Sequence, residues 1–353
     1  MAYLKTMRGK RSLLVLALAA CGSSVGGGGP SVPDSGVESD ASPVDAGGPS
    51  DTGAADRDAA APDATPGKLQ TVFLIMMENH SWSTMAASSS ASYITGTLVP
   101  MGGHAENYTT PPGNHPSELN YLWLEAGSNL GVTNDDDPLA NHQSTKEHLV
   151  TLLDAANISW KAYVEDISGS QCPLTDNGSF VTRHVPQLFF DDVTDNSSVS
   201  SSNCVTHIRP YGEFATDLEK GTVARYNFIT PNLCNDMHGF STNCGSQNFD
   251  QIGAGDKWLQ AEVPKILASS AYKNNGVLFI LWDEGDQALF GQASDGPIPL
   301  IVLSPKAMAG YTSRTKLTHS SMLRTLQEIF GVTPLLRDAA NALDLSEFFT
   351  SFP

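Results

Sequence analysis

Continuous runs of apolar residues recur along this chain of 353 residues, at positions 72–77, 277–282 and 299–303. A strand with one wet face alternates polar and apolar side chains, whereas these runs are apolar on both faces. Such runs are typical of strands buried between layers of helices. Segments 158–164 and 226–230 predict two further strands. The pattern predicts an α/β fold with a central, mostly parallel sheet flanked by helices.

Helical spacing and capping residues predict the helices between these strands. One helix is expected to begin at Ser117, which occupies an N-cap position, and to end before Gly127. Residues 144–147 form a capping-box pattern at the start of a second helix, and Asp256 is expected to cap a third. Residues 335–349 predict a last helix near the end of the chain.

Two long segments carry little periodic pattern. Residues 83–115 are rich in Ser, Thr, Gly and Pro and are expected to form a loop. Residues 169–210 contain two cysteines and few apolar runs, and predict an insertion held by a disulfide. Substrate specificity is expected to depend on these two segments.

The first sixty-seven residues differ in composition from the rest. Residues 1–21 combine a basic segment, a short apolar segment and the sequence Leu-Ala-Ala-Cys, the parts of a bacterial lipoprotein signal whose cysteine, Cys21, is lipidated. Residues 22–67 are rich in Gly, Ser, Pro, Ala and Asp and predict a disordered linker. Residues 68–353 are expected to form one domain, exported to the bacterial cell envelope and anchored there through Cys21.

The chain is acidic, with a formal net charge of −18 at pH 7, most of which falls on residues 68–353. An acidic surface repels the phosphate backbone, so nucleic acid is not expected as a partner. An anionic small substrate would need local positive charge, which a metal ion or histidines could supply.

Four cysteines remain when Cys21 is assigned to the lipid anchor. An even number of cysteines in an exported chain predicts disulfides. Proximity along the chain favours the pairs Cys172–Cys204 and Cys234–Cys244, although the sequence leaves the other pairings open. A zinc site built from cysteines is the weaker alternative, because no spacing is Cys-x-x-Cys.

Polar residues follow the apolar strands directly. Glu78-Asn79 and Asp283-Glu284 each come at the end of a wholly apolar run. Three histidines lie just beyond strand ends or at helix starts, at positions 115, 238 and 319. Parallel strands bring their carboxyl ends to one edge of the sheet, so these side chains are expected to meet there. Oxygen ligands, a hydroxyl and histidines at one edge predict a metal-dependent hydrolase, with Ser117 as nucleophile.

The ordered sequence blocks resemble the phosphoesterase family, which contains bacterial phospholipases C and acid phosphatases and belongs to the alkaline phosphatase-like superfamily. The resemblance covers nearly all of residues 70–350 and is closest to the acid phosphatase branch. It is carried by VFLIMMENHSW at 72–82, HPSELNY at 115–121, ISWKAYVED at 158–166, NFITPNLCNDMH at 227–238, GDKWL at 255–259, LWDE at 281–284 and THSS at 318–321.

This resemblance implies a three-layer fold like that of alkaline phosphatase and a role for each matching residue. It implies that one divalent ion is held by four residues: Glu78, Asn79, Asp283 and Glu284. Ser117 matches the hydroxyl that is phosphorylated. Phosphate is expected to contact Asn120, His115, His238 and His319, with Asp236 as a ligand or an orienter of His238.

Two positions depart from the family pattern. Leu119 stands where the acid phosphatase branch has proline, which affects the geometry of the loop and none of the chemistry. The acidic pair Asp283-Glu284 stands where two-metal members have Asp-His. Oxygen ligands favour a single Ca²⁺, Mg²⁺ or Mn²⁺ ion over Zn²⁺.

The leading hypothesis is a lipid-anchored phosphomonoesterase that acts on a phosphate ester through a phosphoserine intermediate. A phospholipase C-type phosphodiesterase is the alternative within the same family. A binding lipoprotein that kept the fold and lost activity is the alternative outside it, and the presence of Ser117 beside both metal pairs disfavours that alternative.

Overall fold

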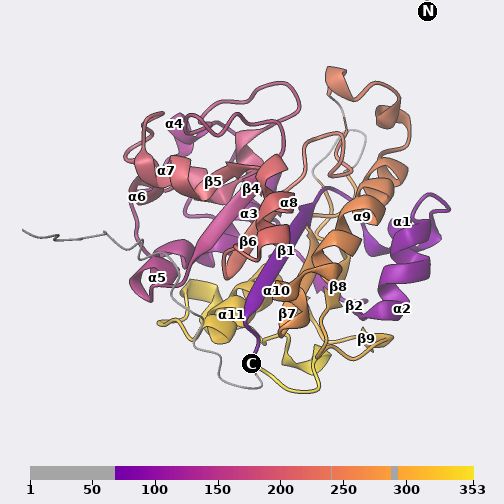
Figure 1. The fold of residues 1–353 in the computed structure, drawn as a ribbon. Helices are drawn as coiled ribbons and strands as arrows, with labels where there is room; N and C mark the ends of the chain where they lie inside the picture. Colours follow the sequence, from indigo (N-terminus) through magenta and orange to yellow (C-terminus); the bar gives the residue numbers. More distant parts are fainter. Residues whose placement is uncertain (1–67, 240, 288–292) are drawn as a thin grey trace, which may run out of the picture. The chain divides into compact units, whose positions relative to one another are not determined.

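The computed structural model describes residues 68–239, 241–287 and 293–353, all of which belong to one compact unit within residues 60–353 (Figure 1). The expected signal, Cys21 and the linker at 22–67 lie outside the described residues. Among the described helices, none is both long and apolar enough to cross a membrane.

A central sheet of eight strands organises this unit, in the order β5-β4-β6-β1-β7-β8-β2-β9. Among the described strands of this sheet, β8 alone runs against its neighbours, while the others are parallel to one another. The expected mostly parallel sheet is confirmed. Its strands are β1 (Thr71–Met77), β2 (Gly103–Ala105), β4 (Trp160–Val164), β5 (Ile208–Pro210), β6 (Tyr226–Thr230), β7 (Gly276–Trp282), β8 (Leu300–Leu303) and β9 (Tyr311–Ser313).

Two central strands, β1 and β7, are buried along almost their whole length, as their unbroken apolar sequences predict. They pair in parallel from Thr71 with Gly276 to Met77 with Trp282, so both strands end at the same level. A small separate pair joins β3 (Tyr108–Thr109) to β10 (Leu317–Thr318).

Helices pack on both faces of the sheet. Phe214 of α8 contacts Phe73 of β1 on one face, and Tyr121 of α3 contacts Phe228 of β6 on the other. The longer helices are α3 (Ser117–Ala126), α5 (Leu149–Ala155), α8 (Gly212–Lys220), α9 (Gln251–Ala268) and α11 (His319–Phe330). The shorter ones are α1 (Trp82–Ala87), α2 (Val99–Met101), α4 (Pro138–Asn141), α6 (Asp191–Thr194), α7 (Ser202–His207) and α10 (Ser270–Lys273).

The expected disulfide within residues 169–210 is present, but the expected loop at 83–115 and the expected helix at 335–349 were wrong, and residues 169–210 also contribute to the sheet. Residues 83–115 contain α1, α2, two strands and a π-helix (Ile94–Leu98), and residues 169–210 supply the edge strand β5. Instead of one helix, residues 335–349 form two short 3₁₀ helices (Arg337–Ala340 and Ser346–Phe348). Three further 3₁₀ helices are Thr182–His184, Pro186–Phe189 and Thr242–Phe249. Tertiary packing fixes these short elements, so helical periodicity does not reveal them.

The expected caps also differ from the structure. Pro116 is the N-cap of α3, and Ser117 is the first helical residue, so its hydroxyl is not used for capping. His148 precedes α5, which makes the capping box at 144–147 wrong. Asp250 caps α9, whereas Asp256 lies inside that helix and accepts hydrogen bonds from the main chain at 93 and 94.

Both favoured disulfides are present. Cys172 pairs with Cys204, and Cys234 pairs with Cys244. The second bridge ties the loop after β6 to the 3₁₀ helix that begins at Thr242. The four described cysteines are therefore bonded in pairs, and a zinc site built from them is wrong.

Candidate active site

The two acidic strand ends meet as the parallel register requires. The main-chain N–H of Asp283 donates to the carbonyl of Met77 at 3.0 Å, which holds the ends of β1 and β7 together. Asn79, in a left-handed conformation with φ of 34°, donates its own main-chain N–H to Oδ1 of Asp283 at 3.0 Å. Its side-chain amide donates to Oε1 of Glu284 at 2.7 Å. Three of the four expected metal ligands thus hold one another in place.

Glu78 lies at the centre of a second set of contacts. The hydroxyl of Ser117 donates to its Oε2 at 3.3 Å, and the phenol of Tyr121 donates to its Oε1 at 2.5 Å. Nε2 of His184 lies 3.2 Å from the same Oε1, and the imidazole is stacked on the ring of Tyr121. Ser117 and Tyr121 are one helical turn apart at the start of α3, so both face β1.

The loop after β6 supplies Asp236 and His238. The carbonyl of Asp236 accepts the main-chain N–H of Glu78 at 2.8 Å, which places this loop beside the end of β1. One carboxylate oxygen of Asp236 accepts the N–H of His238 at 2.7 Å, and the other lies 3.3 Å from Nδ1 of His184. Asp236 therefore orients His238 through the main chain and contacts His184 through its side chain.

Three carboxyl groups are buried together here, on Glu78, Asp236 and Asp283. Burial raises the pKa of Glu78 and of Asp236 well above the ordinary values, and the charge of Asp283 raises both further. Burial, followed by the charge of Glu284, raises the pKa of Asp283 to about 7. Like charges in a buried site disfavour ionisation unless a cation balances them.

The donor atoms in this cluster fit a hard divalent cation. Among the described residues, Oδ1 of Asn79 and Oδ2 of Asp283 are buried and have no hydrogen-bond partner. Carboxylate and amide oxygens are the ligands that Ca²⁺, Mg²⁺ and Mn²⁺ prefer. Within residues 68–239, 241–287 and 293–353, however, no three His, Cys, Asp or Glu side chains already converge at metal-binding distances. Asn79 and Asp283 are thus the residues best placed to hold an ion.

Glu284 is engaged by neighbours on the other side of the cluster. Its Oε2 accepts from Nδ1 of His115 at 2.6 Å and from the amide of Asn120 at 3.2 Å. Nε2 of His115 bonds to Oδ1 of Asp295 at 2.8 Å. The hydrogen bond to Glu284 outweighs burial and raises the pKa of His115. An imidazole that donates to two carboxylates is the cationic form, so His115 balances the charge of Glu284.

His319 begins α11 and points at the main chain of β7. A carbonyl can only accept, so Nε2 of His319 donates to the carbonyl of Asp283, at 2.7 Å. Nδ1 then accepts from the hydroxyl of Tyr108 at 3.2 Å. Burial lowers the pKa of His319 to about 4, which keeps the ring neutral. Both ring nitrogens are used, and this histidine holds Asp283 in place.

The structure thus brings the ten expected site residues to one edge of the sheet, and it adds three that the sequence did not suggest. His184 comes from the segment expected to be an insertion, where it stands between Arg183 and Val185 and follows no strand end. Asp295 precedes β8, which starts at this edge because it runs antiparallel to β7. Tyr121 closes the HPSELNY segment at 115–121, and the sequence alone does not indicate that its hydroxyl bonds to Glu78.

Comparison with known sequences gives consistent matches. The sequence profile of the phosphoesterase family matches residues 105–333. The chain is 26% identical over 278 residues to the phosphatidylinositol-3-phosphatase of Mycobacterium tuberculosis, covering 79% of this chain and 82% of that protein. It is 27% identical over 234 residues to the phosphate-repressible acid phosphatase of Penicillium chrysogenum, covering 64% of this chain and 51% of that protein. It therefore spans most of the bacterial relative and about half of the fungal one.

Solved structures share the fold at low sequence identity. A protein of the alkaline phosphatase superfamily from Vibrio parahaemolyticus superposes with a TM-score of 0.53 at 10% identity, covering 83% of this chain and 74% of the other. A lipoteichoic acid synthase from Listeria monocytogenes gives a TM-score of 0.52 at 12% identity, covering 77% and 76%. The expected three-layer architecture is confirmed.

Proposed function

Since the chain belongs to the phosphoesterase family and is a hydrolase of phosphoric esters, we propose that it is a metal-dependent phosphomonoesterase of the acid phosphatase type. Ser117 is the proposed nucleophile. The observation that carries the proposal is the hydrogen bond from the hydroxyl of Ser117 to the buried carboxylate of Glu78.

The position of Ser117 suits attack on an anionic group. It is the first residue of a ten-residue helix, where unpaired N–H groups and the positive end of the helix dipole favour a phosphate. Its hydroxyl donates to Glu78, the carboxyl group whose pKa burial and the charge of Asp283 raise, so Ser117 lies at the edge of the buried carboxyl cluster. A buried carboxylate is a stronger base than an exposed one, once it is ionised.

The proposed reaction has two steps. Oγ of Ser117 forms a bond to phosphorus, its proton passes to Glu78, and the bond between phosphorus and the alcohol oxygen breaks. The leaving alkoxide takes a proton from solvent, and Glu78 returns its proton to solvent. Water then cleaves the phosphoserine: its hydroxide part bonds to phosphorus, its proton restores the hydroxyl of Ser117, and phosphate is released. A divalent cation held by Asn79 and Asp283 would supply positive charge that stabilises the serine oxygen and the phosphate oxygens.

The other site residues position these groups. Tyr121 fixes the carboxylate of Glu78, with His184 beside it. His115 and Asn120 fix Glu284, which in turn holds the amide of Asn79. Burial lowers the pKa of His238 to about 4, so this ring would meet the substrate in its neutral form. We assign His238 to the phosphate oxygens because Asp236 places it at the same strand end.

Both curated relatives described above are named as phosphatases, which favours a monoester over the diester of a phospholipase C. Export is the proposed location. The two disulfides support it, because such bonds persist in oxidising compartments. Lipidation of Cys21 remains part of the proposal.

The test compares hydrolysis of phenyl phosphate and of a phosphate diester by the full chain and by Ser117→Ala. We expect monoester hydrolysis, loss of nearly all activity in the variant, and loss on treatment with a chelator that Mg²⁺, Mn²⁺ or Ca²⁺ reverses. Mass spectrometry of the acid-quenched enzyme should show added phosphate on Ser117. Ser128→Ala, a change just beyond the same helix, is the control and should keep full activity. Diester hydrolysis alone would contradict the proposal.

A further inference from the structure

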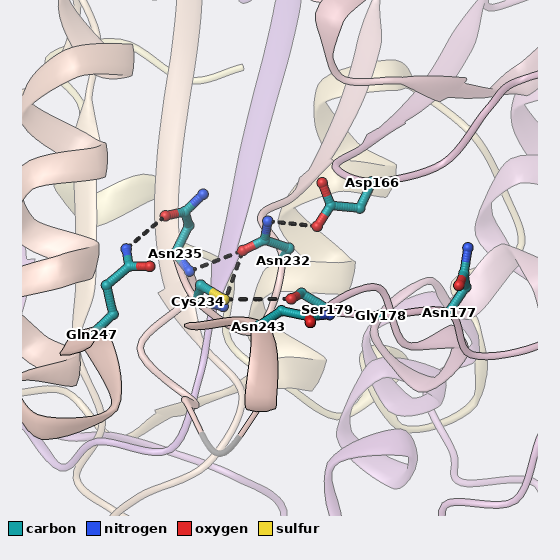
Figure 2. Close-up of a pocket in the computed structure, with 9 residues that line it drawn as sticks. All are labelled: Asp166, Asn177, Gly178, Ser179, Asn232, Cys234, Asn235, Asn243 and Gln247. Atoms are coloured by element: carbon teal, nitrogen blue, oxygen red, sulfur yellow. Dashed lines mark hydrogen bonds between the residues drawn. The ribbon is translucent and has the colours of Figure 1, made fainter. Parts of the chain in front are cut away.

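A polar cavity of about 440 Å³ lies beside the candidate active site, at the carboxyl ends of β4 and β6 (Figure 2). Its wall includes Asn232 and Asn235, from the same loop that carries Asp236 and His238. The carbonyl of Asn232 accepts the main-chain N–H of Asp236, so the wall of the cavity continues directly into the catalytic cluster. The volume is within the range of small-molecule sites.

The lining has an unusual chemical composition. Its nine residues are Asp166, Asn177, Gly178, Ser179, Asn232, Cys234, Asn235, Asn243 and Gln247. Five of them carry side-chain amides, and none of the nine is a lysine, an arginine or an aromatic residue. A carboxamide offers a donor and an acceptor side by side, which suits the hydroxyl groups of a polyol. A second phosphate would find no cation here, and an acyl chain would find no apolar wall.

Part of this hydrogen-bonding capacity is already used to hold the cavity in shape. The amide of Asn232 donates to Asp166 at 2.8 Å, and its oxygen accepts two main-chain N–H groups. Asn235 donates to Glu165 at 2.8 Å. The disulfide from Cys234 to Cys244 closes one wall. Figure 2 shows Asn232 and Asn235 between Gln247 on one side and Asp166 on the other.

The remaining hydrogen-bonding capacity lies on two solvent-exposed asparagines of the lining, Asn177 and Asn243. Within the described part of the chain, the side-chain amides of Asn177 and Asn243 make no hydrogen bond. The main chain of Asn177 is fixed by two hydrogen bonds with Phe180, and Ser241 caps the N–H of Asn243. The main chain at both residues is therefore already ordered, so binding would order the two side chains alone.

We propose that this cavity is a subsite for the alcohol part of the substrate, and that the alcohol is a neutral polyol such as a sugar or glycerol. The inference rests on the proposed function, because the phosphate of the same molecule would lie at Ser117. Amides from Asn177, Asn243 and Gln247 would pair with its hydroxyl groups.

The experiment measures kcat and KM for glucose 6-phosphate, glycerol 3-phosphate and phenyl phosphate. In the double variant Asn177→Ala/Asn243→Ala of the full chain, we expect KM for the two polyol esters to rise about tenfold, because two neutral hydrogen bonds are lost. The kinetic constants for phenyl phosphate should not change. Asn274→Ala, an exposed asparagine before β7 at the opposite end of the sheet, is the matched control. An equal effect on all three esters, or none, would overturn the subsite.

Direct binding separates this inference from the proposed function. Saturation-transfer NMR with free glucose needs no catalysis, and we expect a signal with the wild-type chain that the double variant loses. If wild type binds glucose in this way but hydrolyses no ester, the phosphatase proposal fails and the polyol site stands. If wild type hydrolyses the esters but glucose gives no signal even at high concentration, the polyol site is wrong.

Discussion

The imidazole of His319 donates a hydrogen bond of 2.7 Å to the main-chain carbonyl of Asp283. It joins the start of α11 to the end of β7 and fixes the backbone that presents Asp283 to the cluster. Removal of groups that orient a metal ligand typically costs about 10- to 100-fold in affinity or activity. We expect a loss of that size in kcat/KM and in Mn²⁺ affinity for His319→Ala. His207→Ala is the control, since His207 also bonds to a carbonyl but lies in α7, outside the site.

Tyr121 tests the environment of Glu78. Its hydroxyl stabilises the ionised carboxylate and so lowers the pKa of Glu78 relative to a site without it. Tyr121→Phe should therefore move the acid limb of the kcat/KM profile to higher pH and reduce the maximum by about tenfold. Tyr163→Phe removes an equivalent bond, to Asp217, away from the site and should leave the profile in place. If the acid limb of the Tyr121→Phe profile did not shift, Glu78 would not be the group that accepts the proton.

Metal affinity should depend on pH through Asp283, whose pKa is raised to about 7 in the absence of a cation. Protons and a cation compete for this carboxylate, so affinity should be high above pH 7 and fall as the pH drops through that value. Calorimetric titration with Mn²⁺ at several pH values measures the effect. Asp283→Asn should bind weakly at every pH, with unchanged circular dichroism. If Mn²⁺ affinity still depended steeply on pH in Asp283→Asn, the proton that competes with the metal would bind to another group.

A buried charge cluster away from the site should set part of the pH dependence of stability. His148 is fully buried and bonds to Glu125 and Asp192. Burial lowers the pKa of His148, but the hydrogen bonds to the two carboxylates outweigh it and the net direction is upward. The stabilisation is therefore complete below the ordinary value of 6.5 and is lost as the pH rises through the folded value.

Replacement of His148 leaves two carboxylates without their buried partner. We expect His148→Gln to lower the free energy of unfolding by about 3 kcal/mol at pH 6, with a smaller difference at pH 9. Urea titrations at both pH values measure this difference. A constant difference would show that His148 does not change its protonation on unfolding over this range.

The ends of the central strands could be predicted from the sequence, because short unbroken apolar runs are typical of strands buried on both faces of a parallel sheet. Glu78, Asn79, Asp283 and Glu284 follow such runs, so their meeting could be inferred from topology alone. His184 could not be found in this way, because it follows no strand and its position depends on the packing of short helices. Asp295 was missed for another reason. The apolar sequence of β8 does not reveal that this strand is antiparallel to β7, so its start and not its end lies at the site.

The roles of the histidines were also beyond sequence. A histidine near a helix start can face a substrate, a carboxylate or a main-chain carbonyl, and only the folded arrangement selects one of these. His115 faces two carboxylates, and His319 faces a carbonyl and a phenol. The positions of these histidines in the sequence are compatible with a contact to substrate, to a carboxylate or to a main-chain carbonyl.

The bridge between Cys234 and Cys244 has a consequence for where the enzyme can work. Cys234 stands two residues before Asp236, so the same covalent closure orders the loop that supplies Asp236 and His238. A newly made chain in a reducing cytoplasm would contain Ser117 but lack this disulfide. We predict that the reduced chain is inactive and does not hydrolyse phosphorylated metabolites in the cytoplasm. Catalysis would then begin with oxidation after export. An assay of Cys234→Ser/Cys244→Ser beside wild type, with and without reductant, tests this, and full activity in the variant would refute it.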